Sequence, residues 1–194
     1  MSRIFCIVGK SASGKDTIYK EILKNCDKLI PIIPYTTRPM RSGETDGVDY
    51  NFVTEDQMNG FDAAGCIIEK RQYLTTQGIW NYFTVKFDVK PQTDYILITT
   101  LEGAMGITDH YGADMVRIVY LTIDDKTRLL RYIERESKQA RPDYEEVCRR
   151  FIADQKDFSQ ENINALKNVY SINSALSVEE CLAEWDKIYH AAEV

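Results

Sequence analysis

The first residues that could carry chemistry form a loop, GKSASGKD, from Gly9 to Asp16. Its G-x4-G-K spacing is that of a phosphate-binding loop, and it lies between a strand-like apolar run and a helical pattern. Glycines let the backbone curl so that several N–H groups face one phosphate chain, while the helix N-terminus and Lys15 add positive charge. The alternative is a Gly/Ser turn that merely opens a helix. The flanking strand and helix favour phosphate binding, with Asp16 in a position where Ser or Thr is expected.

A second polar stretch, YTTRPMRSGETDGVDYNF, runs from Tyr35 to Phe52. Arg38 and Arg41 lie three residues apart before a glycine turn, and Tyr50 lies beyond a second turn. Two guanidinium groups and a phenol could converge on one phosphate, because the arginine fork suits a tetrahedral oxyanion. The alternative is a solvated polar loop. The stretch resembles, almost position for position, the GMP-binding signature of guanylate kinases, T-T-R-x-x-R-x-G-E-x-x-G-x-D-Y-x-F.

This resemblance implies a residue that recognises the base. Glu69 matches the glutamate of the family pattern F-I-E-W, and one carboxylate can accept from both N1 and N2 of guanine, whereas adenine has no such pair of donors. The run Tyr82-Phe83-Thr84 is similar to the family's Y-G-[ST], whose tyrosine and hydroxyl residue contact the nucleotide. Phe83 replaces the glycine, and the stretch between Glu69 and Tyr82 is a few residues longer than in the family.

Arginines further along the chain indicate a lid. Arg131 and Arg135 are four residues apart on one predicted helix, hence on one face. Arg149 and Arg150 lie on the next helix, beyond a break at Pro142. The family uses R-x-x-x-R and then R-[LF] in matching places to neutralise the phosphoryl group in transfer. The alternative is surface arginines paired with neighbouring glutamates.

Two further motifs support the resemblance, and one of them lacks part of the family pattern. Glu102-Gly103 is similar to the end of the family's D-x-D-x-Q-G, but its two aspartates are replaced by Ile98 and Thr100. Asn173 is similar to an N-[DN] turn that lies near the adenine in the family. The missing aspartates put the handling of metal in doubt. Asp16 is a hard oxygen ligand that could hold Mg²⁺ in their place, the alternative being a simple helix cap.

The resemblance, together with the loop, implies three sets of site residues and one metal ligand. The catalytic set is Lys15, Arg131, Arg135 and Arg150. The ATP-binding set is Gly9, Ser11, Ala12, Ser13, Gly14, Lys15, Asp16, Thr17 and Asn173. The GMP-binding set is Pro34, Arg38, Arg41, Tyr50, Glu69, Tyr82, Thr84 and Thr100. The expected cofactor is Mg²⁺ bound with ATP, and its expected protein ligand is Asp16.

Strands that alternate with helices must position these residues. Short apolar runs predict strands at 3–8, 29–33, 52–53, 67–69, 82–85, 95–99, 115–123 and 169–172. Helical spacing predicts helices at 15–26, from about 102, from 124 to about 138, at 144–165 and at 178–190. Asp124 is expected to cap the helix that begins there, and Thr54 with Gln57 predicts a capping box. The predicted fold is α/β: a three-layer P-loop NTPase fold with a parallel sheet, a small mixed α/β GMP-binding lobe and a helical lid. Residues 1–33 and 91–194 are expected to form the core, with the lid at about 124–150, and residues 34–90 the inserted lobe.

Composition narrows the class of protein. The 194 residues are 44% hydrophobic, enough for one domain with a core. A formal net charge of -6 argues against general nucleic-acid binding, although cations focused in a cleft can still bind a small anion. Five cysteines without a C-x-x-C pair indicate free thiols in a reducing compartment. The N-terminus does not resemble a signal peptide and the apolar runs are too short for a membrane span, so a cytoplasmic protein is expected.

The predicted activity is transfer of the γ-phosphate of ATP to GMP, giving ADP and GDP. Two alternatives remain open: a kinase of the same fold acting on another monophosphate such as dGMP or IMP, and a non-catalytic guanylate-kinase-like binding module. The expected partners are ATP and GMP as small-molecule substrates, with no nucleic acid and no membrane. The sequence leaves the oligomeric state open.

Overall fold

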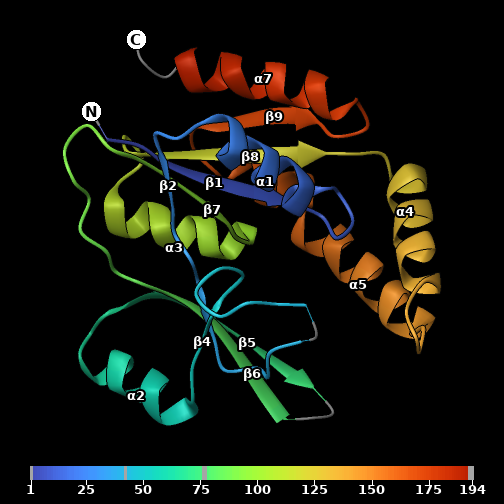
Figure 1. Ribbon diagram of the computed structural model, residues 1–194, viewed down its shortest axis with the longest axis horizontal. Coiled ribbons are helices and arrows are strands. Elements are labelled where there is room, and N and C mark those ends of the chain that lie inside the picture. Colours follow the sequence, from blue (N-terminus) through green and yellow to red (C-terminus); the bar gives the residue numbers. More distant parts are fainter. Residues whose placement is uncertain (1, 42, 76–77, 192–194) are drawn as a thin grey trace.

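The computed structural model describes residues 2–41, 43–75 and 78–191 (Figure 1). Its central feature is a five-stranded parallel sheet in the order β2-β7-β1-β8-β9. The strands are β1 (Ile4–Gly9), β2 (Leu29–Pro31), β7 (Asp94–Ile98), β8 (Val116–Thr122) and β9 (Val169–Asn173). The predicted parallel sheet is confirmed, and β1 lies in its middle.

Helices cover both faces of this sheet because β1 is apolar on both sides. Phe5 and Ile7 point into one core cluster, together with residues of α1 (Lys15–Asn25) and α7 (Val178–Ala191). Ile4, Cys6 and Val8 point into a second cluster on the opposite face. The helices of that second face are α3 (Leu101–Tyr111) and α6 (Gln160–Asn164), and Phe158, directly after α5 (Tyr144–Asp157), packs there as well. The alternation of side chains along a strand therefore gives the three predicted layers.

The carboxyl ends of these parallel strands meet at one edge of the sheet. There β1 runs into the glycine-rich loop, and β7 runs into Thr100, which caps α3 by accepting from the Gly103 amide at 3.1 Å. β8 runs into Asp124, whose carboxylate accepts from the Thr127 amide at 2.9 Å and starts α4 (Asp125–Ser137). Asp124 is thus confirmed as the predicted cap, and this edge of the sheet gathers the side chains that could contact a nucleotide.

A second, four-stranded sheet lies apart from the first, in the order β4-β3-β6-β5 (Figure 1). Its elements are β3 (Tyr35–Thr36), β4 (Asn51–Phe52), β5 (Ile67–Thr75), β6 (Gly78–Val85) and the helix α2 (Glu55–Ala63). The predicted capping box is confirmed: Thr54 and Gln57 each bond the other's amide at the start of α2. Phe83 is fully buried and stacks on Tyr35 with 5.3 Å between ring centroids, so it forms the core of this lobe.

Two predictions of length were wrong. The predicted continuous helix over 144–165 is two helices, because Ser159 caps α6 by accepting from the Asn162 amide at 3.3 Å. Between them Phe158 leaves the helix and stacks on Tyr120 of β8, so burial of an aromatic ring outweighs helix continuity. The strand predicted at 67–69 extends to Thr75 and forms a long hairpin with β6, which accommodates the additional residues between Glu69 and Tyr82. None of the described helices is long and apolar enough to cross a membrane.

A largely buried ion pair joins the two ends of the chain to the sheet. Arg3 donates from its amide and Nε to one carboxylate oxygen of Asp94 at 3.0 and 3.1 Å, and from Nη2 to the other at 2.5 Å. Arg3 also donates to the carbonyl of Tyr189 at 2.6 Å, and the Tyr189 hydroxyl donates to Asp94 at 3.0 Å. Burial alone would raise the pKa of Asp94, but the hydrogen bonds from Arg3 and Tyr189 outweigh it and hold the pKa below its usual value. This triad closes β1, β7 and α7 against one another.

We predict that Asp94→Asn lowers the free energy of unfolding at pH 7 by about 3 kcal/mol, because the charged bidentate pair between Asp94 and the buried Arg3 guanidinium is replaced by neutral hydrogen bonds. The depressed pKa means that the contribution is complete above the unfolded pKa near ~3.9 and is lost as the pH falls through the folded pKa. Denaturant unfolding at pH 7 and at stepwise lower pH measures the free energy of unfolding of the parent protein and of Asp94→Asn. The difference between the two values should become smaller as the pH falls. Asp88→Asn, at an exposed position nearby, is the control. Equal loss in both variants would contradict the role of the triad.

Candidate active site

The loop after β1 has the backbone that a phosphate-binding loop requires. Ala12 and Gly14 adopt left-handed conformations with φ of 60° and 87°, which turn the loop back toward the start of α1. Gly9 has no room for a side chain, since a Cβ there would lie 2.7 Å from Ser13 Oγ and 3.0 Å from the Leu121 carbonyl oxygen. The strand end and the helix start are therefore held close together, with the loop amides concentrated between them.

Lys15 is the cation of this loop. Its Nζ donates to the carbonyl oxygens of Gly9 at 2.7 Å and Lys10 at 3.0 Å. Burial lowers the pKa of Lys15, while the nearby carboxylates of Asp16 and Asp154 act in the opposite direction. The ammonium group is thus desolvated and bonded to neutral carbonyls, a state that an anionic phosphate would stabilise.

A surface hollow opens at the loop. It is lined by Ala12, Gly14, Lys15, Asp16, Thr17, Arg131 and Arg135. Arg131 donates to the carbonyl of Ser174, directly after β9, at 3.1 Å, and the guanidinium of Arg135 lies 4.7 Å from the centroid of the Tyr132 ring. The structure therefore brings the two predicted arginines of α4 to the predicted loop.

Arg150 lies outside the residues that line this hollow. Its Nε donates to Glu146 at 2.7 Å, and Arg149 donates to the same carboxylate at 2.6 Å. These bonds, first that from Arg149, lower the pKa of Glu146 to about 2. The alternative interpretation of the lid arginines, as surface residues paired with neighbouring glutamates, thus describes Arg149 and Arg150 in this structure. It does not describe Arg131 or Arg135.

The remaining ATP-set residues occupy the same edge of the sheet. The Ser11 amide donates to Asp154 at 2.8 Å, and Ser13 is fully buried. Asn173 ends β9, where its side-chain oxygen accepts from the Ala175 amide at 3.0 Å. Asn173 therefore has the turn geometry expected from its motif.

The second sheet carries the predicted phosphate ligands. Arg38 is only 3% exposed and forms a bidentate pair with Glu44, at 2.7 Å from Nη1 and 2.5 Å from Nη2. Its guanidinium lies 5.1 Å from the Tyr50 ring centroid and 5.3 Å from that of Phe52. Its buried Nε has no hydrogen-bond partner among the described residues. The Arg41 amide also donates to Glu44 at 2.7 Å, so that carboxylate fixes both arginine positions while the Arg41 side chain stays exposed.

Two more members of the predicted set frame this group. The Tyr82 ring meets Tyr50 edge-on at 5.7 Å between centroids. Pro34 lies just before β3, where its carbonyl accepts from the Asn51 amide at 2.9 Å. Pro34 therefore supports the backbone of the group.

The predicted base-recognition residues lie together, but with a residue that sequence reasoning missed. Glu69 Oε1 accepts from the Thr84 hydroxyl at 2.6 Å. Arg71 donates to both oxygens of Glu69, from Nε at 2.8 Å and from Nη2 at 3.0 Å, and its Nη1 donates to the Thr100 hydroxyl at 3.2 Å. Glu69 and Arg71 are two positions apart on β5 and so share one face, a signal visible only once the strand is known to continue beyond Glu69.

Helix α3 packs directly on this cluster because two of its residues are glycines. A Cβ on Gly106 would lie 2.7 Å from the Cβ of Glu69. A Cβ on Gly103 would clash with the Thr99 hydroxyl and lie 3.4 Å from Glu69 Oε2 and 3.5 Å from Arg71 Cζ. The cluster is thus enclosed between β5 and the N-terminus of α3.

A fully buried arginine, also missed from the sequence, connects the loop to the helices behind it. Arg128 donates to Asp154 at 2.7 Å and to Asp125 at 3.1 Å, with its guanidinium 4.1 Å from the Phe151 ring centroid. The Asp154 oxygen that accepts from Arg128 is the one that accepts from the Ser11 amide. One carboxylate therefore joins the loop, α4 and α5. Charged residues on amphipathic helices usually face solvent, so the sequence carried no signal of this burial.

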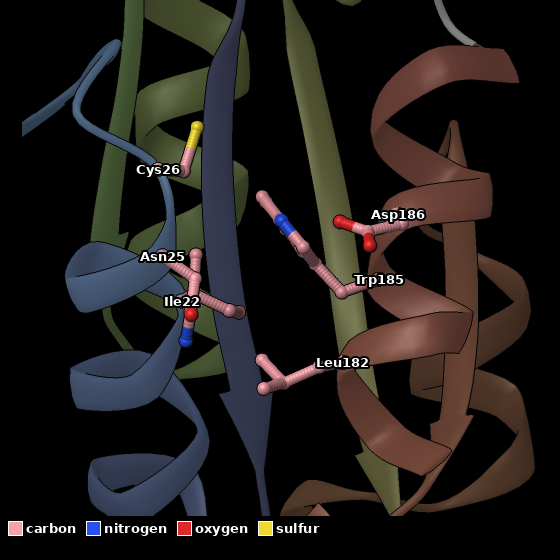
Figure 2. Close-up of a pocket in the computed structure, with 6 residues that line it drawn as sticks. All are labelled: Ile22, Asn25, Cys26, Leu182, Trp185 and Asp186. Atoms are coloured by element: carbon pink, nitrogen blue, oxygen red, sulfur yellow. The ribbon is translucent and has the colours of Figure 1, made fainter. Parts of the chain in front are cut away.

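Figure 2 shows a second hollow, between α1 and α7. It is lined by Ile22, Asn25, Cys26, Leu182, Trp185 and Asp186. Trp185 projects from α7 into the space between the helices, and Ile22 and Trp185 belong to the core cluster of that face. None of the six lining residues is cationic, so this hollow lacks the charge that a phosphate needs.

The family model described as guanylate kinase matches residues 1–159. The chain belongs to the guanylate kinase family. It is 33% identical over 111 residues to a guanylate kinase of Thermotoga maritima, an alignment that covers 57% of this chain and 53%, about half, of that relative. It is 28% identical over 183 residues to a human guanylate kinase, covering 91% of this chain and 90% of the relative. The crystal structure of guanylate kinase from Anaplasma phagocytophilum shares the fold, with a TM-score of 0.67 at 19% identity over 98% of this chain and 85% of that one.

The departures from the guanylate kinase signature now have structural reasons. Phe83, in place of a glycine, packs in the core of the lobe, and the additional residues lie in the β5–β6 hairpin. Ile98, in place of the first aspartate, ends β7 and packs against the core cluster of α1 and α7. Thr100, in place of the second, caps α3 and accepts from Arg71.

We predict that Asp154→Asn weakens ATP binding and lowers the melting temperature. The single oxygen of the amide can still accept from both the Ser11 amide and Arg128, as one oxygen of Asp154 does, but it carries no charge. The buried Arg128 therefore loses a charged partner, and breaking such a pair costs about 3–5 kcal/mol of stability. Calorimetric titration with ATP and thermal unfolding measure the two effects. The control is Asp157→Asn, an exposed carboxylate near the end of the same helix. If both variants bind ATP like the parent protein, Asp154 does not hold the loop.

Proposed function

We propose that this chain transfers the terminal phosphoryl group of ATP to GMP, giving ADP and GDP. Membership of the guanylate kinase family and the similarity to proteins described as guanylate kinases support the proposal. The observation that carries it is a pair of cationic clusters. One, formed by Lys15, Arg131 and Arg135, lies at the carboxyl edge of the first sheet, and the other, around Arg38, lies beside the second sheet. Burial raises the pKa of the Tyr50 phenol, and the nearby Arg38 and Arg71 guanidinium groups oppose this rise. Arg71 of the second sheet donates to Thr100, at the carboxyl edge of the first sheet, at 3.2 Å, so the two sheets meet beside these clusters.

Each cluster has one role in this reaction. The loop amides and Lys15 bind the β- and γ-phosphates of ATP, and Arg131 and Arg135 stabilise the charge on the phosphoryl group in transfer. In the lobe, which we take as the acceptor-binding unit within residues 34–90, Arg38 and Arg41 bind the phosphate of GMP. A bond forms between an oxygen of the GMP phosphate and the γ-phosphorus, while the bond from that phosphorus to the bridging oxygen of ADP breaks. The acceptor phosphate is already ionised, so no general base is required and catalysis rests on positioning and charge.

Magnesium suits the residues of the loop hollow. No group of three or more His, Cys, Asp or Glu side chains in the described part of the chain could hold a metal by itself. Mg²⁺ bound with a nucleotide, however, takes most of its ligands from phosphates and water and needs only one or two carboxylates. The exposed Asp16 carboxylate lines the hollow and supplies one. When bound, the ion neutralises phosphate charge.

We place the enzyme in the cytoplasm, with the two nucleotides as its partners. All five cysteines are free thiols, which agrees with a reducing compartment. The pairing of Lys15, Arg131 and Arg135 at one hollow supports an enzyme over a non-catalytic binding module, because a module that binds only the acceptor needs no cations there.

A coupled assay of ADP release tests the proposed function. ADP should form only when ATP and GMP are both present. Arg41→Ala should lower kcat/KM for GMP about ten- to hundredfold, the range of a charge-assisted bond to phosphate, and leave the KM for ATP near that of the parent protein. Lys70→Ala removes a cation that is paired with Asp62 at 3.2 Å, and serves as the control. Equal ADP release without an acceptor would show a hydrolase instead.

We predict that Asp16→Ala raises the Mg²⁺ concentration needed for half-maximal activity. The variant loses one hard oxygen ligand, so the ion is held by phosphates and water alone. Asp16→Ser should need a Mg²⁺ concentration between those of Asp16→Ala and the parent protein, because a hydroxyl can also coordinate the ion. A magnesium titration at saturating ATP and GMP measures the shift. An unchanged requirement in Asp16→Ala would mean that Asp16 serves only at the start of the helix.

A further inference from the structure

We propose that Arg71 determines base specificity, by occupying the carboxylate of Glu69 and recognising the 6-oxo edge of the acceptor purine. The consequence is an acceptor site that takes 6-oxopurine monophosphates as a class and distinguishes GMP only weakly from IMP. This inference rests on the proposed function, in which Glu69 faces the acceptor base.

The carboxylate of Glu69 has little capacity left for a ligand. Arg71 donates to both of its oxygens and the Thr84 hydroxyl donates to Oε1, three bonds in all from described residues. A carboxylate accepts about four hydrogen bonds. The N1 and N2 groups of guanine would need at least two of those positions, so Glu69 cannot serve both while Arg71 stays in place.

Arg71 itself supplies donors to this pocket. Of the five N–H groups of its guanidinium, Nε–H, one on Nη1 and one on Nη2 are engaged by Thr100 and Glu69. The other N–H group on each of Nη1 and Nη2 has no partner among the described residues. Arginine favours the O6 and N7 acceptors of a 6-oxopurine, whereas adenine presents an amino donor at position 6. The free donors of Arg71 therefore match guanine and hypoxanthine and are mismatched with adenine.

The position of Arg71 is fixed by packing as well as by hydrogen bonds. Its side chain is 9% exposed and that of Glu69 is 5% exposed. The N-terminus of α3 closes one side of the pocket. A Cβ on Gly103 would lie 3.5 Å from Arg71 Cζ, so the helix backbone packs close to the guanidinium. Thr100 anchors Nη1 from the end of β7. A buried ion pair that is fully supported in this way does not open readily, because either charge left alone would be strongly destabilised.

The charge of the pocket follows from this pair. Glu69 alone would present a buried negative charge that favours the two donors of guanine. Paired with Arg71, the site is neutral overall and offers both donors and an acceptor. Loss of the 2-amino group, the difference between guanine and hypoxanthine, then leaves no unmatched carboxylate behind.

The test is binding and turnover of GMP, IMP and AMP by the parent protein, Arg71→Met and Lys70→Met. Lys70 is the neighbouring cation on the opposite face of β5, so its variant is the matched control. The parent protein and Lys70→Met should bind GMP and IMP within about tenfold of each other and AMP at least about a hundredfold more weakly. In Arg71→Met the freed Glu69 accepts from N1 and N2, so the preference for GMP over IMP should rise about tenfold or more, the range of one unmatched buried polar group. Arg71→Lys keeps the charge without the fork and should fall between them.

The outcomes separate the inference from the proposed function. A parent protein that binds GMP more than about a hundredfold better than IMP overturns the inference without any variant, even if Arg71→Met fails to fold. An Arg71→Met protein that retains the parent melting profile and ATP affinity, with an unchanged ratio of GMP to IMP dissociation constants, also overturns it. Normal binding ratios without ADP formation would instead leave the base specificity standing and refute the proposed transfer. Failure to bind any of the three monophosphates refutes both.

Discussion

The arrangement of the molecule depends on β1, a strand buried on both faces between two parallel neighbours. Every residue of Ile4–Gly9 is buried, so helices must cover both faces of the sheet and the carboxyl ends of the strands must meet at one edge. The glycine-rich loop can curl over that edge only because Gly9 leaves room for Ser13 and the Leu121 carbonyl. Without a fully buried β1 there would be no common edge at which Lys15, Thr100 and Asn173 gather.

In a chain with a formal net charge of -6, three arginines with buried side chains are held in place by the same device. Arg38, Arg71 and Arg128 are each paired with a carboxylate of their own neighbourhood, at Glu44, Glu69 and Asp154. Such pairs add little net stability but fix where each guanidinium points, and pre-set geometry is what phosphoryl transfer requires. Arg131 and Arg135, which line the hollow, are held instead by a carbonyl and by an aromatic ring.

Most residues of the candidate site could be predicted from sequence spacing and motifs, whereas the ion pairs among them could not. The loop from Gly9 to Asp16 was predicted because its glycines, its lysine and the start of the next helix lie close together in the sequence, where their spacing sets the local backbone geometry. Glu69 and Thr84, which are hydrogen-bonded to each other, were both predicted as site residues from family motifs. Arg71 was not predicted, because the predicted strand ended at Glu69. The long helix predicted to residue 165 failed for a similar reason, because the burial of Phe158 against Tyr120 is not visible in helical periodicity.

By itself the sequence determined the alternation of strands and helices in the core, the glycine-rich loop after the first strand, the caps at Thr54 and Asp124 and the signature that identifies the family. These features depend on residues close together in the chain, where spacing fixes geometry. Only the tertiary structure decided that Arg128 is buried under the loop and that Arg150 is paired away from the hollow. It alone also placed Arg71 across Glu69 and Thr100. The physical reason is that the partner of a charged side chain is chosen by packing between elements distant in sequence, and burial turns an ordinary surface charge into one that must be paired.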